Sequence, residues 1–399
     1  MQDSNDIVIT GMGVVSAIGV GLAATLTSLR EGLTGIGAMK YLASSHRDIP
    51  VGEVKLSNDE MMQLLDTDYD LRLSRSALMG RLALREALET SRLTPSLTPH
   101  LVSSTTVGGM DRREAYHSGE RDCDLVHAQI ATHNCADCTD MIAEPFGTFA
   151  SLTTISTACS SATNAIITGA NMLRSRRADI VVAGGTECLS RFHLNGFNAL
   201  MILDSGQCKP FDRDRAGLNL GEGAAYLVLE TAASAQRRGV TPLCRLSGYG
   251  NACDAFHQTA SSPDGEGAYL AMQKALAMAG MKPADIQYVN AHGTGTPNND
   301  LSESTAIRRV FGDTVPPVSS TKSFTGHTTS ASGSIEAVFC IMALQHQFLP
   351  VNLNWHTPMD DGIVPVTDSR VKTPIVNVMS NAFGFGGNDS SIILSNSAL

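Results

Sequence analysis

Apolar residues follow two patterns along this chain: short continuous runs, and longer stretches in which they recur every three to four positions. Residues 7–15, 179–185 and 224–230 are apolar runs, which predict buried strands. Residues 75–90 and 160–176 have the spacing of helices with one buried face. Because strands alternate with helices, the pattern predicts a largely parallel sheet that helices cover on both faces.

The second half of the chain repeats this order of elements. Its predicted strands and helices are, in order, residues 243–249, 267–280, 286–292, 302–311, 331–346 and 391–394. Two halves of similar order, residues 1–240 and 241–399, indicate a duplicated α/β unit that packs as one body. In such folds, sites form where the loops at the strand ends converge. We therefore expect functional residues in those loops.

Composition and charge narrow the class of protein. With 43% hydrophobic and 17% charged residues, the chain resembles globular proteins with a large core. Its net charge of −10 gives no overall attraction to nucleic acid or to an anionic membrane. The first ten residues lack the features of a signal peptide, and no apolar run approaches the roughly 18 residues of a membrane span. Nine scattered cysteines do not suggest a disulfide framework. We expect a cytoplasmic protein with no membrane span and no nucleic-acid partner.

One cluster of cysteines and histidines invites comparison with metal sites. Cys123, His127, His133, Cys135 and Cys138 fall within sixteen residues and include a Cys-x-x-Cys pair. Their spacings fit none of the paired zinc patterns well. A zinc site stays open here, but the expectation is a helix and loop near the active site, without metal.

Cys159 is the strongest candidate for a reactive residue. It lies in residues 153–166, where a β-branched run changes to small residues and then to a helical pattern. A sharp strand-to-helix turn would place Cys159 at the first helical turn, where unpaired N–H groups and the helix dipole favour a thiolate. A thiolate at this position would be an activated nucleophile. The alternative is a small buried hydrophobic residue, as most free cysteines are.

Three later segments, residues 290–300, 319–336 and 380–389, contain more glycine, threonine and histidine than a core needs. Two of them contain His292 and His327, each of which, taken singly, could be structural. Together with a cysteine nucleophile, they would supply two hydrogen-bond donors for a developing oxyanion. The glycine-rich loop would supply backbone N–H groups for a second oxyanion.

At this point the chain resembles a known family, the β-ketoacyl-acyl-carrier-protein synthases, the elongating condensing enzymes of the thiolase superfamily. The resemblance spans nearly the whole chain. The motifs that carry it are Thr157–Ser161, Lys209–Ala224, His292–Thr296, Lys322–His327 and Gly384–Gly387. Any one of them would be weak evidence, whereas all five in this order are specific. The resemblance implies the thiolase-like, duplicated α-β-α-β-α layered fold.

The resemblance also implies a reaction. Cys159 would take an acyl chain from a carrier-protein thioester, and the backbone N–H groups of Cys159 and Phe385 would hold the oxyanion. Malonyl-carrier protein would then lose CO₂, and His292 and His327 would stabilise the resulting enolate as neutral donors. The enolate would attack the acyl group and lengthen it by two carbons. No metal and no cofactor are implied beyond the phosphopantetheine of the acyl carrier protein.

Supporting roles follow from the same resemblance. Lys322 would set the electrostatics around the second histidine, and Glu336 would pair with this lysine. Thr294 and Thr296 would hydrogen-bond the pantetheine arm, and Asp300 would order their loop. For Lys322, Glu336 and Asp300 a purely structural ion network is the equally weighted alternative.

The chain departs from the family pattern at two places. Leu218 stands where most relatives have an aromatic residue, so the wall of the acyl pocket differs. The late glycine loop continues as Asn388-Asp389, where Thr-Asn is common. These departures leave the length and saturation of the acyl group open, and also the movement of the loop at Phe385.

Related reactions fit the sequence less well. A thiolase would have a second cysteine in the loop 384–387, which has none, and a chalcone-synthase-like enzyme would lack His327. Relatives are dimers, so we expect a homodimer or a heterodimer with a related ketosynthase-like subunit, in fatty acid or polyketide/polyene synthesis. The runner-up is the non-catalytic chain-length factor of such a pair. An acidic carrier protein needs a basic dock. The candidate residues form two groups, Arg72, Arg75 and Arg81, and Arg174, Arg176 and Arg177.

Overall fold

The computed structural model describes residues 6–94, 97–117 and 133–396. Within these residues, each half of the chain contributes five main strands to one sheet. The first half supplies β1 (Ile7–Ser16), β3 (His100–Ser104), β4 (Ser151–Ile155), β5 (Ile180–Glu187) and β6 (Gly223–Thr231). The second half supplies β7 (Cys244–Cys253), β8 (Tyr288–Asn290), β9 (Val318–Ser319), β10 (Asn377–Gly384) and β11 (Asn388–Ser395). A short strand, β2 (Gly19–Val20), pairs with β1.

Both halves use their strands in the same order. The sheet runs β4-β3-β5-β6-β1 and continues β7-β11-β10-β8-β9. The five strands of each half can be numbered in chain order and read from the outer edge of the sheet toward its centre. Both halves then give the order third, second, fourth, fifth and first. The two sets meet where β1 pairs with β7, with Val8 opposite Arg245. This repeat confirms the predicted duplicated α/β fold. The predicted boundary at residue 240 lies just before β7 and stays a prediction.

The sheet is mixed, so the prediction of a largely parallel sheet is wrong for its central strands. β3 is parallel to β4 and β5, and β8 is parallel to β9 and β10. In contrast, β6 is antiparallel to β5 and β1, and β11 is antiparallel to β10 and β7. A strand that is covered on both faces is apolar throughout in either direction, so its sequence does not report its direction. Only residues 385–387 separate β10 from β11, and such a short turn requires antiparallel strands.

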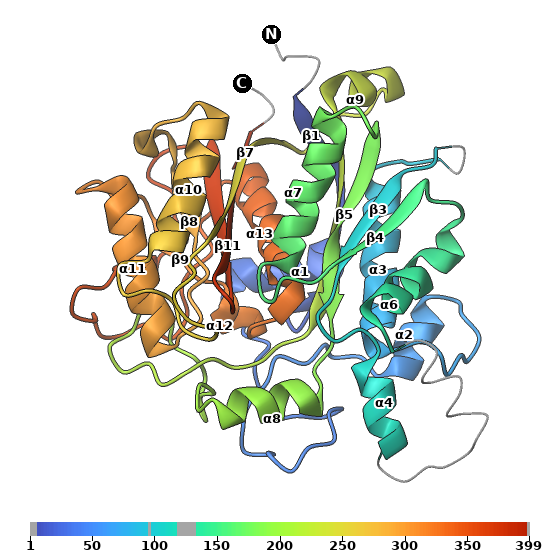
Figure 1. Ribbon diagram of the computed structural model, residues 1–399, viewed down its shortest axis with the longest axis horizontal. Helices are drawn as coiled ribbons and strands as arrows, with labels where there is room; N and C mark the ends of the chain where they lie inside the picture. Colours follow the sequence, from blue (N-terminus) through green and yellow to red (C-terminus); the bar gives the residue numbers. More distant parts are fainter. Residues whose placement is uncertain (1–5, 95–96, 118–132, 397–399) are drawn as a thin grey trace.

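Helices form three layers around the sheet (Figure 1). α7 (Ser161–Arg174) and α13 (Ser332–His346) pack against each other between the two halves of the sheet. α3 (Arg75–Thr90) covers β1 and β6 from outside, and α10 (Glu266–Ala279) covers β7 and β11, beside α11 (Pro297–Phe311). The result is the α-β-α-β-α layering that the resemblance implies.

The remaining helices lie at the ends and edges of these layers. They are α1 (Leu22–Glu31), α2 (Asn58–Leu64), α4 (Met110–His117), α6 (Cys135–Ala143), α8 (Arg191–Ala199), α9 (Ala232–Arg238) and α12 (Lys322–Thr325). The largest apolar core surrounds α7 and α13, and it includes Ile166 and Val338, both fully buried. In the described part of the chain, no helix combines the length and the apolar character that crossing a membrane requires.

Candidate active site

Cys159 lies in the turn between β4 and α7, two residues before the helix begins. Ala158 has a φ of 51°, a left-handed conformation that is uncommon without glycine and turns the chain sharply. Ser161 Oγ closes the turn: it accepts from the Thr157 N–H at 2.8 Å and donates to the Ala158 carbonyl at 2.6 Å. The structure thus has the sharp strand-to-helix turn that the sequence predicts, and only 5% of Cys159 is exposed.

The two histidines are held by different elements. His292 follows β8, and the backbone N–H groups of His292 and Gly293 donate to the Glu303 carboxyl at 2.8 and 2.7 Å. His327 lies between α12 and α13, and its Nδ1 is 3.0 Å from Ser332 Oγ. This contact leaves the Nε2 of His327 for other partners. Both rings are buried, with 2% exposed in each residue.

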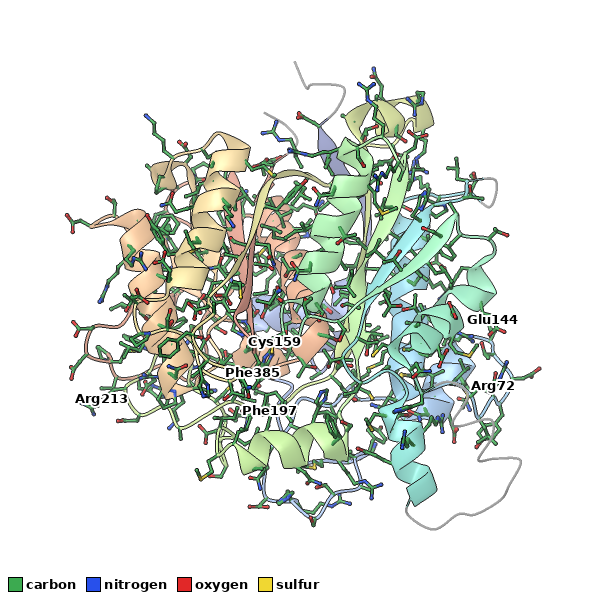
Figure 2. The ribbon with its side chains drawn as sticks, viewed as in Figure 1. Arg72, Glu144, Cys159, Phe197, Arg213 and Phe385 are labelled. Atoms are coloured by element: carbon green, nitrogen blue, oxygen red, sulfur yellow. The ribbon has the colours of Figure 1, made fainter. Side chains whose placement is uncertain are left out.

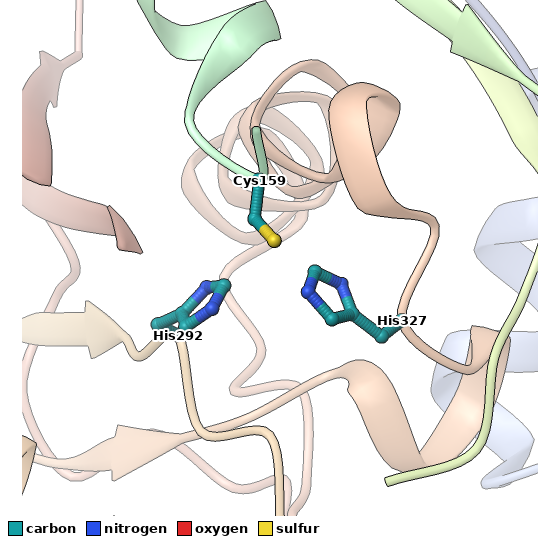
Figure 3. A group of neighbouring side chains, drawn as sticks. All are labelled: Cys159, His292 and His327. Atoms are coloured by element: carbon teal, nitrogen blue, oxygen red, sulfur yellow. The ribbon is translucent and has the colours of Figure 1, made fainter. Parts of the chain in front are cut away.

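Cys159, His292 and His327 converge at one point (Figure 3). The Cys159 sulfur and one nitrogen of each histidine lie within 4.8 Å of one another. Cys159 precedes α7 and His327 precedes α13, so the duplication places them at the starts of the two central helices. No other group of such side chains among the described residues has a spacing that could hold a metal ion.

Burial controls the protonation of all three side chains. It raises the pKa of Cys159 to about 11, although nearby Lys322 and the backbone N–H groups of Phe385 and Cys159 oppose this rise. The predicted resting thiolate is therefore wrong, because desolvation outweighs the N-terminal end of the helix. Burial, followed by Lys322, lowers the pKa of His292 and His327 well below the usual value. The site at neutral pH contains a thiol and two neutral imidazoles.

Lys322 and Glu336 form a buried ion pair beside the histidines. The Lys322 Nζ lies 2.6 Å from Glu336 Oε1, with 1% and 4% of the two side chains exposed. Burial raises the pKa of Glu336, and Lys322 opposes this. Lys322 also lowers the pKa of Cys159 and of both histidines. The predicted pair is present, and the positive charge of Lys322 acts on Cys159 and on both histidines.

The loop after β10 places Phe385 next to Cys159. The positive φ of Gly386 and Gly387, 83° and 77°, allows this tight turn. The Phe385 ring stacks on Phe197 of α8, with centroids 5.7 Å apart (Figure 2). Asn388 Oδ1 ties the loop to its surroundings, accepting hydrogen bonds from Ser160 Oγ, Asn164 Nδ2 and Asn251 Nδ2.

The loop between β8 and α11 contains the remaining predicted residues. Asp300 is fully buried and accepts hydrogen bonds from the backbone N–H groups of Phe211 at 2.7 Å and Gly295 at 3.1 Å. The hydroxyls of Thr294 and Thr296 lie 2.9 Å apart, and Thr296 also caps α11. Burial raises the pKa of Asp300. Asp300 thus joins this loop to the segment at Phe211, and both threonines line the cavity described next.

A cavity of about 370 Å³ leads from the surface to Cys159. Cys159, His292 and His327 line its inner end, together with Leu218 and the Phe385 loop. Residues farther from Cys159 include Met201, Thr259, Ser261, Pro297 and Asn298. The lining is mostly apolar with a few polar groups, as in pockets that bind small organic groups. The site can therefore enclose a thioester next to a sulfur nucleophile and two neutral donors.

Comparison with known proteins identifies the family. The "Beta-ketoacyl synthase, N-terminal domain" model matches residues 4–235, and the "Beta-ketoacyl synthase, C-terminal domain" model matches residues 243–356. The chain belongs to the β-ketoacyl synthase family. Its members are condensing acyltransferases. A 3-oxoacyl-[acyl-carrier-protein] synthase 2 of Staphylococcus aureus is 33% identical over 98% of this chain and 99% of that protein. Nodulation protein E of Rhizobium meliloti is 34% identical over 96% and 97% of the two chains.

Solved structures of ketosynthases have the same fold. The ishigamide ketosynthase/chain length factor superposes with a TM-score of 0.92 at 29% identity, covering 98% of this chain and 99% of that one. The ketosynthase ApeO in complex with its chain length factor ApeC from Xenorhabdus doucetiae gives a TM-score of 0.83 at 30% identity, covering 98% of each chain. These β-ketoacyl synthase neighbours establish the thiolase-like fold class.

Two of the three arginines in the first predicted basic dock are buried in this β-ketoacyl synthase. Arg75 is buried and pairs with Glu222 at 2.6 Å, and Arg81 is buried and pairs with Glu144 at 2.9 Å. Arg72 pairs with Asp70 at 2.7 Å on the flank of the molecule, beside Glu144 (Figure 2). The buried Arg75 and Arg81 are therefore not available to a partner, and the position of the carrier-protein dock stays a prediction.

The second candidate dock lies at the opposite end of α7 from Cys159 and stays a prediction. Arg174, Arg176 and Arg177 are exposed at its carboxyl end, whereas Cys159 precedes its first residue. A helix of this length separates the two ends by about 20 Å.

We assign no metal site to the cysteines and histidines of residues 123–138. Cys123 and His127 lie outside the described residues. His133, Cys135 and Cys138 form no group that could hold an ion. The eight cysteines that the structure describes are free thiols.

Two residues of the site have no counterpart in the sequence predictions. Phe197 lies on α8, a helix for which we predict nothing, because its nine residues show no apolar run. Glu303 lies inside the predicted helix 302–311, where an acidic residue on the buried face was the available signal. Both act through backbone or ring contacts that depend on distant segments.

Proposed function

We propose that this chain is a catalytic β-ketoacyl-acyl-carrier-protein synthase in which Cys159 carries the acyl intermediate. The observation that supports this most directly is the convergence of the Cys159 sulfur and one nitrogen of each histidine within 4.8 Å. A nucleophile with two neutral donors suits acyl transfer followed by enolate formation.

The first step is the acylation of Cys159. Because its thiol is protonated, one neutral histidine accepts the proton as the sulfur attacks the thioester of an acyl-carrier protein. The backbone N–H groups of Cys159 and Phe385 face the oxygen of the tetrahedral intermediate. The carrier phosphopantetheine then leaves as a thiol, taking that proton, and Cys159 holds the acyl group.

The second step is decarboxylative condensation. Malonyl-carrier protein enters the same cavity, Thr294 and Thr296 hydrogen-bond its pantetheine arm, and its C–C bond to the carboxylate breaks with loss of CO₂. The electron pair moves into an enolate whose oxygen accepts hydrogen bonds from His292 and His327. The enolate carbon attacks the acyl carbonyl, and the Cys159 sulfur leaves as a thiolate that takes a proton from water to restore the thiol. The product is a β-ketoacyl-carrier protein two carbons longer. Lys322 and Glu336 fix the charge around these groups, and Asp300 holds the loop.

The partners follow from the reaction and from the relatives. Both substrates are attached to acyl carrier protein, so no further cofactor is part of the proposal, and the protein would act in the cytoplasm. Two structural neighbours are ketosynthases described with their chain length factors, which favours a heterodimer over a homodimer. The non-catalytic subunit is the second candidate, and the complete set of Cys159, His292 and His327 favours the catalytic one.

The decisive experiment is intact-protein mass spectrometry after incubation with acyl-carrier proteins of different chain length and unsaturation. We expect the mass of one acyl group on the wild type and on Cys135→Ser, a control for a half-buried thiol elsewhere, and none on Cys159→Ala. The preferred acyl chain would indicate the pathway. Adding a chelator should leave the adduct unchanged. If no acyl chain forms an adduct, with or without a co-expressed chain length factor, the catalytic proposal fails.

A further inference from the structure

His193 is a buried histidine that the proposed reaction does not use. It lies in α8, and 7% of the residue is exposed. Ser190 Oγ caps the helix by accepting a hydrogen bond from the His193 N–H at 3.1 Å. Burial lowers the pKa of this imidazole, so it is neutral at pH 7. A buried neutral ring held at a helix start has a defined position relative to the site.

Phe197, one turn further along α8, contacts two rings. On Phe385 it stacks with an interplanar angle of 19° and a centroid distance of 5.7 Å. On His193 it packs edge to face, with an angle of 89° and a distance of 6.1 Å. Both arrangements are favourable geometries for aromatic pairs. Figure 2 shows Phe197 and Phe385 side by side below Cys159. The position of Phe385 thus depends on a ring that itself rests on His193.

The other side of His193 contacts the end of the sheet. Its Nε2 lies 3.4 Å from Thr106 Oγ1. Thr106 donates to the Glu187 carboxyl through its backbone N–H at 2.9 Å and also through its hydroxyl. Glu187 is fully buried at the carboxyl end of β5 and accepts a further hydrogen bond from Thr105 at 2.6 Å. His193 therefore connects the buried end of β5, through Thr106, to the aromatic ring of Phe197 near the cavity.

We propose that His193 is a positioning residue, which acts through Phe197 to hold the Phe385 N–H over the Cys159 sulfur. It does not touch the reacting atoms. The ring of His193 supplies the edge-to-face contact, and its Nε2 anchors that ring to Thr106. This inference rests on the proposed function only for the role of the Phe385 N–H as an oxyanion donor.

The test uses four variants of the full chain. His193→Leu keeps the approximate volume and removes the ring, whereas His193→Phe keeps the ring and removes the contact with Thr106. Phe197→Leu removes the ring that lies between His193 and Phe385. Asn195→Ala is the matched control, because Asn195 lies on the same helix and is exposed.

Two readouts are compared with the unfolding temperature of each variant. The first is amide hydrogen exchange of the loop 384–388, and the second is the kcat and KM of Cys159 acylation. For His193→Leu and Phe197→Leu we expect faster loop exchange and a kcat lower by about tenfold, with KM within about twofold. His193→Phe should recover to within about threefold of the wild type, and Asn195→Ala should match the wild type.

Two results would overturn the proposal. One is loop exchange in His193→Leu equal to that of the wild type. The other is a folded His193→Phe as defective as His193→Leu, since this would assign the effect to something other than the ring. Loop exchange requires no activity. If the wild type forms no acyl adduct, the proposed function fails while the exchange data still decide the role of His193.

Discussion

The ring of His292 lies edge to face with the ring of His327, with centroids 5.2 Å apart and planes at 83°. Because the rings are nearly perpendicular and equally buried, their free nitrogens can approach one oxygen atom from two directions. Both rings belong to the second half of the chain. His292 lies in the loop after β8, and His327 lies in the loop before α13. The arrangement suits one developing negative charge shared between two donors.

Replacing either histidine with alanine should separate the two steps of the reaction. In His292→Ala or His327→Ala the remaining ring can still accept the Cys159 proton, so the acyl adduct should form. Condensation should fall by about 10²–10³, because one of two enolate donors is missing. Stopped-flow decarboxylation of malonyl-carrier protein and intact mass would measure the two steps. Wild-type condensation in either variant would contradict the shared-oxyanion geometry.

The pH dependence of decarboxylation should be flat on the acid side. Burial and Lys322 lower the pKa of both histidines, so their neutral form is lost only when pH falls through these lowered values. An unperturbed imidazole would instead titrate near pH 6.5. We expect constant kcat from about pH 7.2 down to about pH 6. An acid limb with a midpoint near 6.5 would mean that the histidines are not held neutral.

The Lys322–Glu336 pair offers a way to separate stability from chemistry. Lys322→Met leaves the Glu336 carboxyl buried without its cation, which should cost about 3–5 kcal/mol in the free energy of unfolding. The double variant Lys322→Met/Glu336→Leu should regain most of that stability in urea titrations. Condensation should stay low in both, because burial still lowers the histidine pKa values but the Lys322 cation no longer adds to this effect or lowers the pKa of Cys159. Full activity in the double variant would reduce the pair to a structural role.

Asp389 should make the protein less stable as pH rises. Burial, with Asp254 and Glu303 nearby, raises the pKa of Asp389 to about 8, whereas an unfolded chain has about 3.9. Between these values the folded protein keeps a proton that the unfolded chain has lost, so the free energy of unfolding falls with increasing pH. As pH rises from 5 to 8.5, the free energy of unfolding of Asp389→Asn should therefore increase by at least about 1 kcal/mol relative to that of the wild type. Asp313→Asn, at an exposed site, should show no such difference.

The carrier protein should dock at the mouth of the cavity. Met201 lines this cavity and is 87% exposed. Met201→Asp should raise the KM for acyl-carrier protein by about tenfold, since carrier proteins are acidic and the new charge repels them. The KM for a short acyl-pantetheine thioester should stay unchanged. Arg176→Glu is the control at the far end of α7, and an equal effect there would move the dock.

Local patterns predicted much of the fold. The helix predicted at residues 75–90 is α3 with the same bounds, and the predicted run 224–230 lies within β6. Such elements are visible because one buried face or a continuous apolar run repeats over many residues. Strand direction was not visible, since β6 and β11 are buried along nearly their whole length, as the parallel strand β3 is, and only the pairing distinguishes them.

The sequence by itself determined the order of the elements, the duplication and the chemical groups available, because these depend on residue types at short spacing. Tertiary structure decided that Cys159 is a thiol rather than a thiolate, since its pKa depends on how completely distant segments exclude water. It also decided that Arg75 and Arg81 are buried partners of acidic residues, and that Phe385 rests on Phe197. Burial and long-range contacts arise only when segments far apart in the chain pack together, so no local pattern contains them.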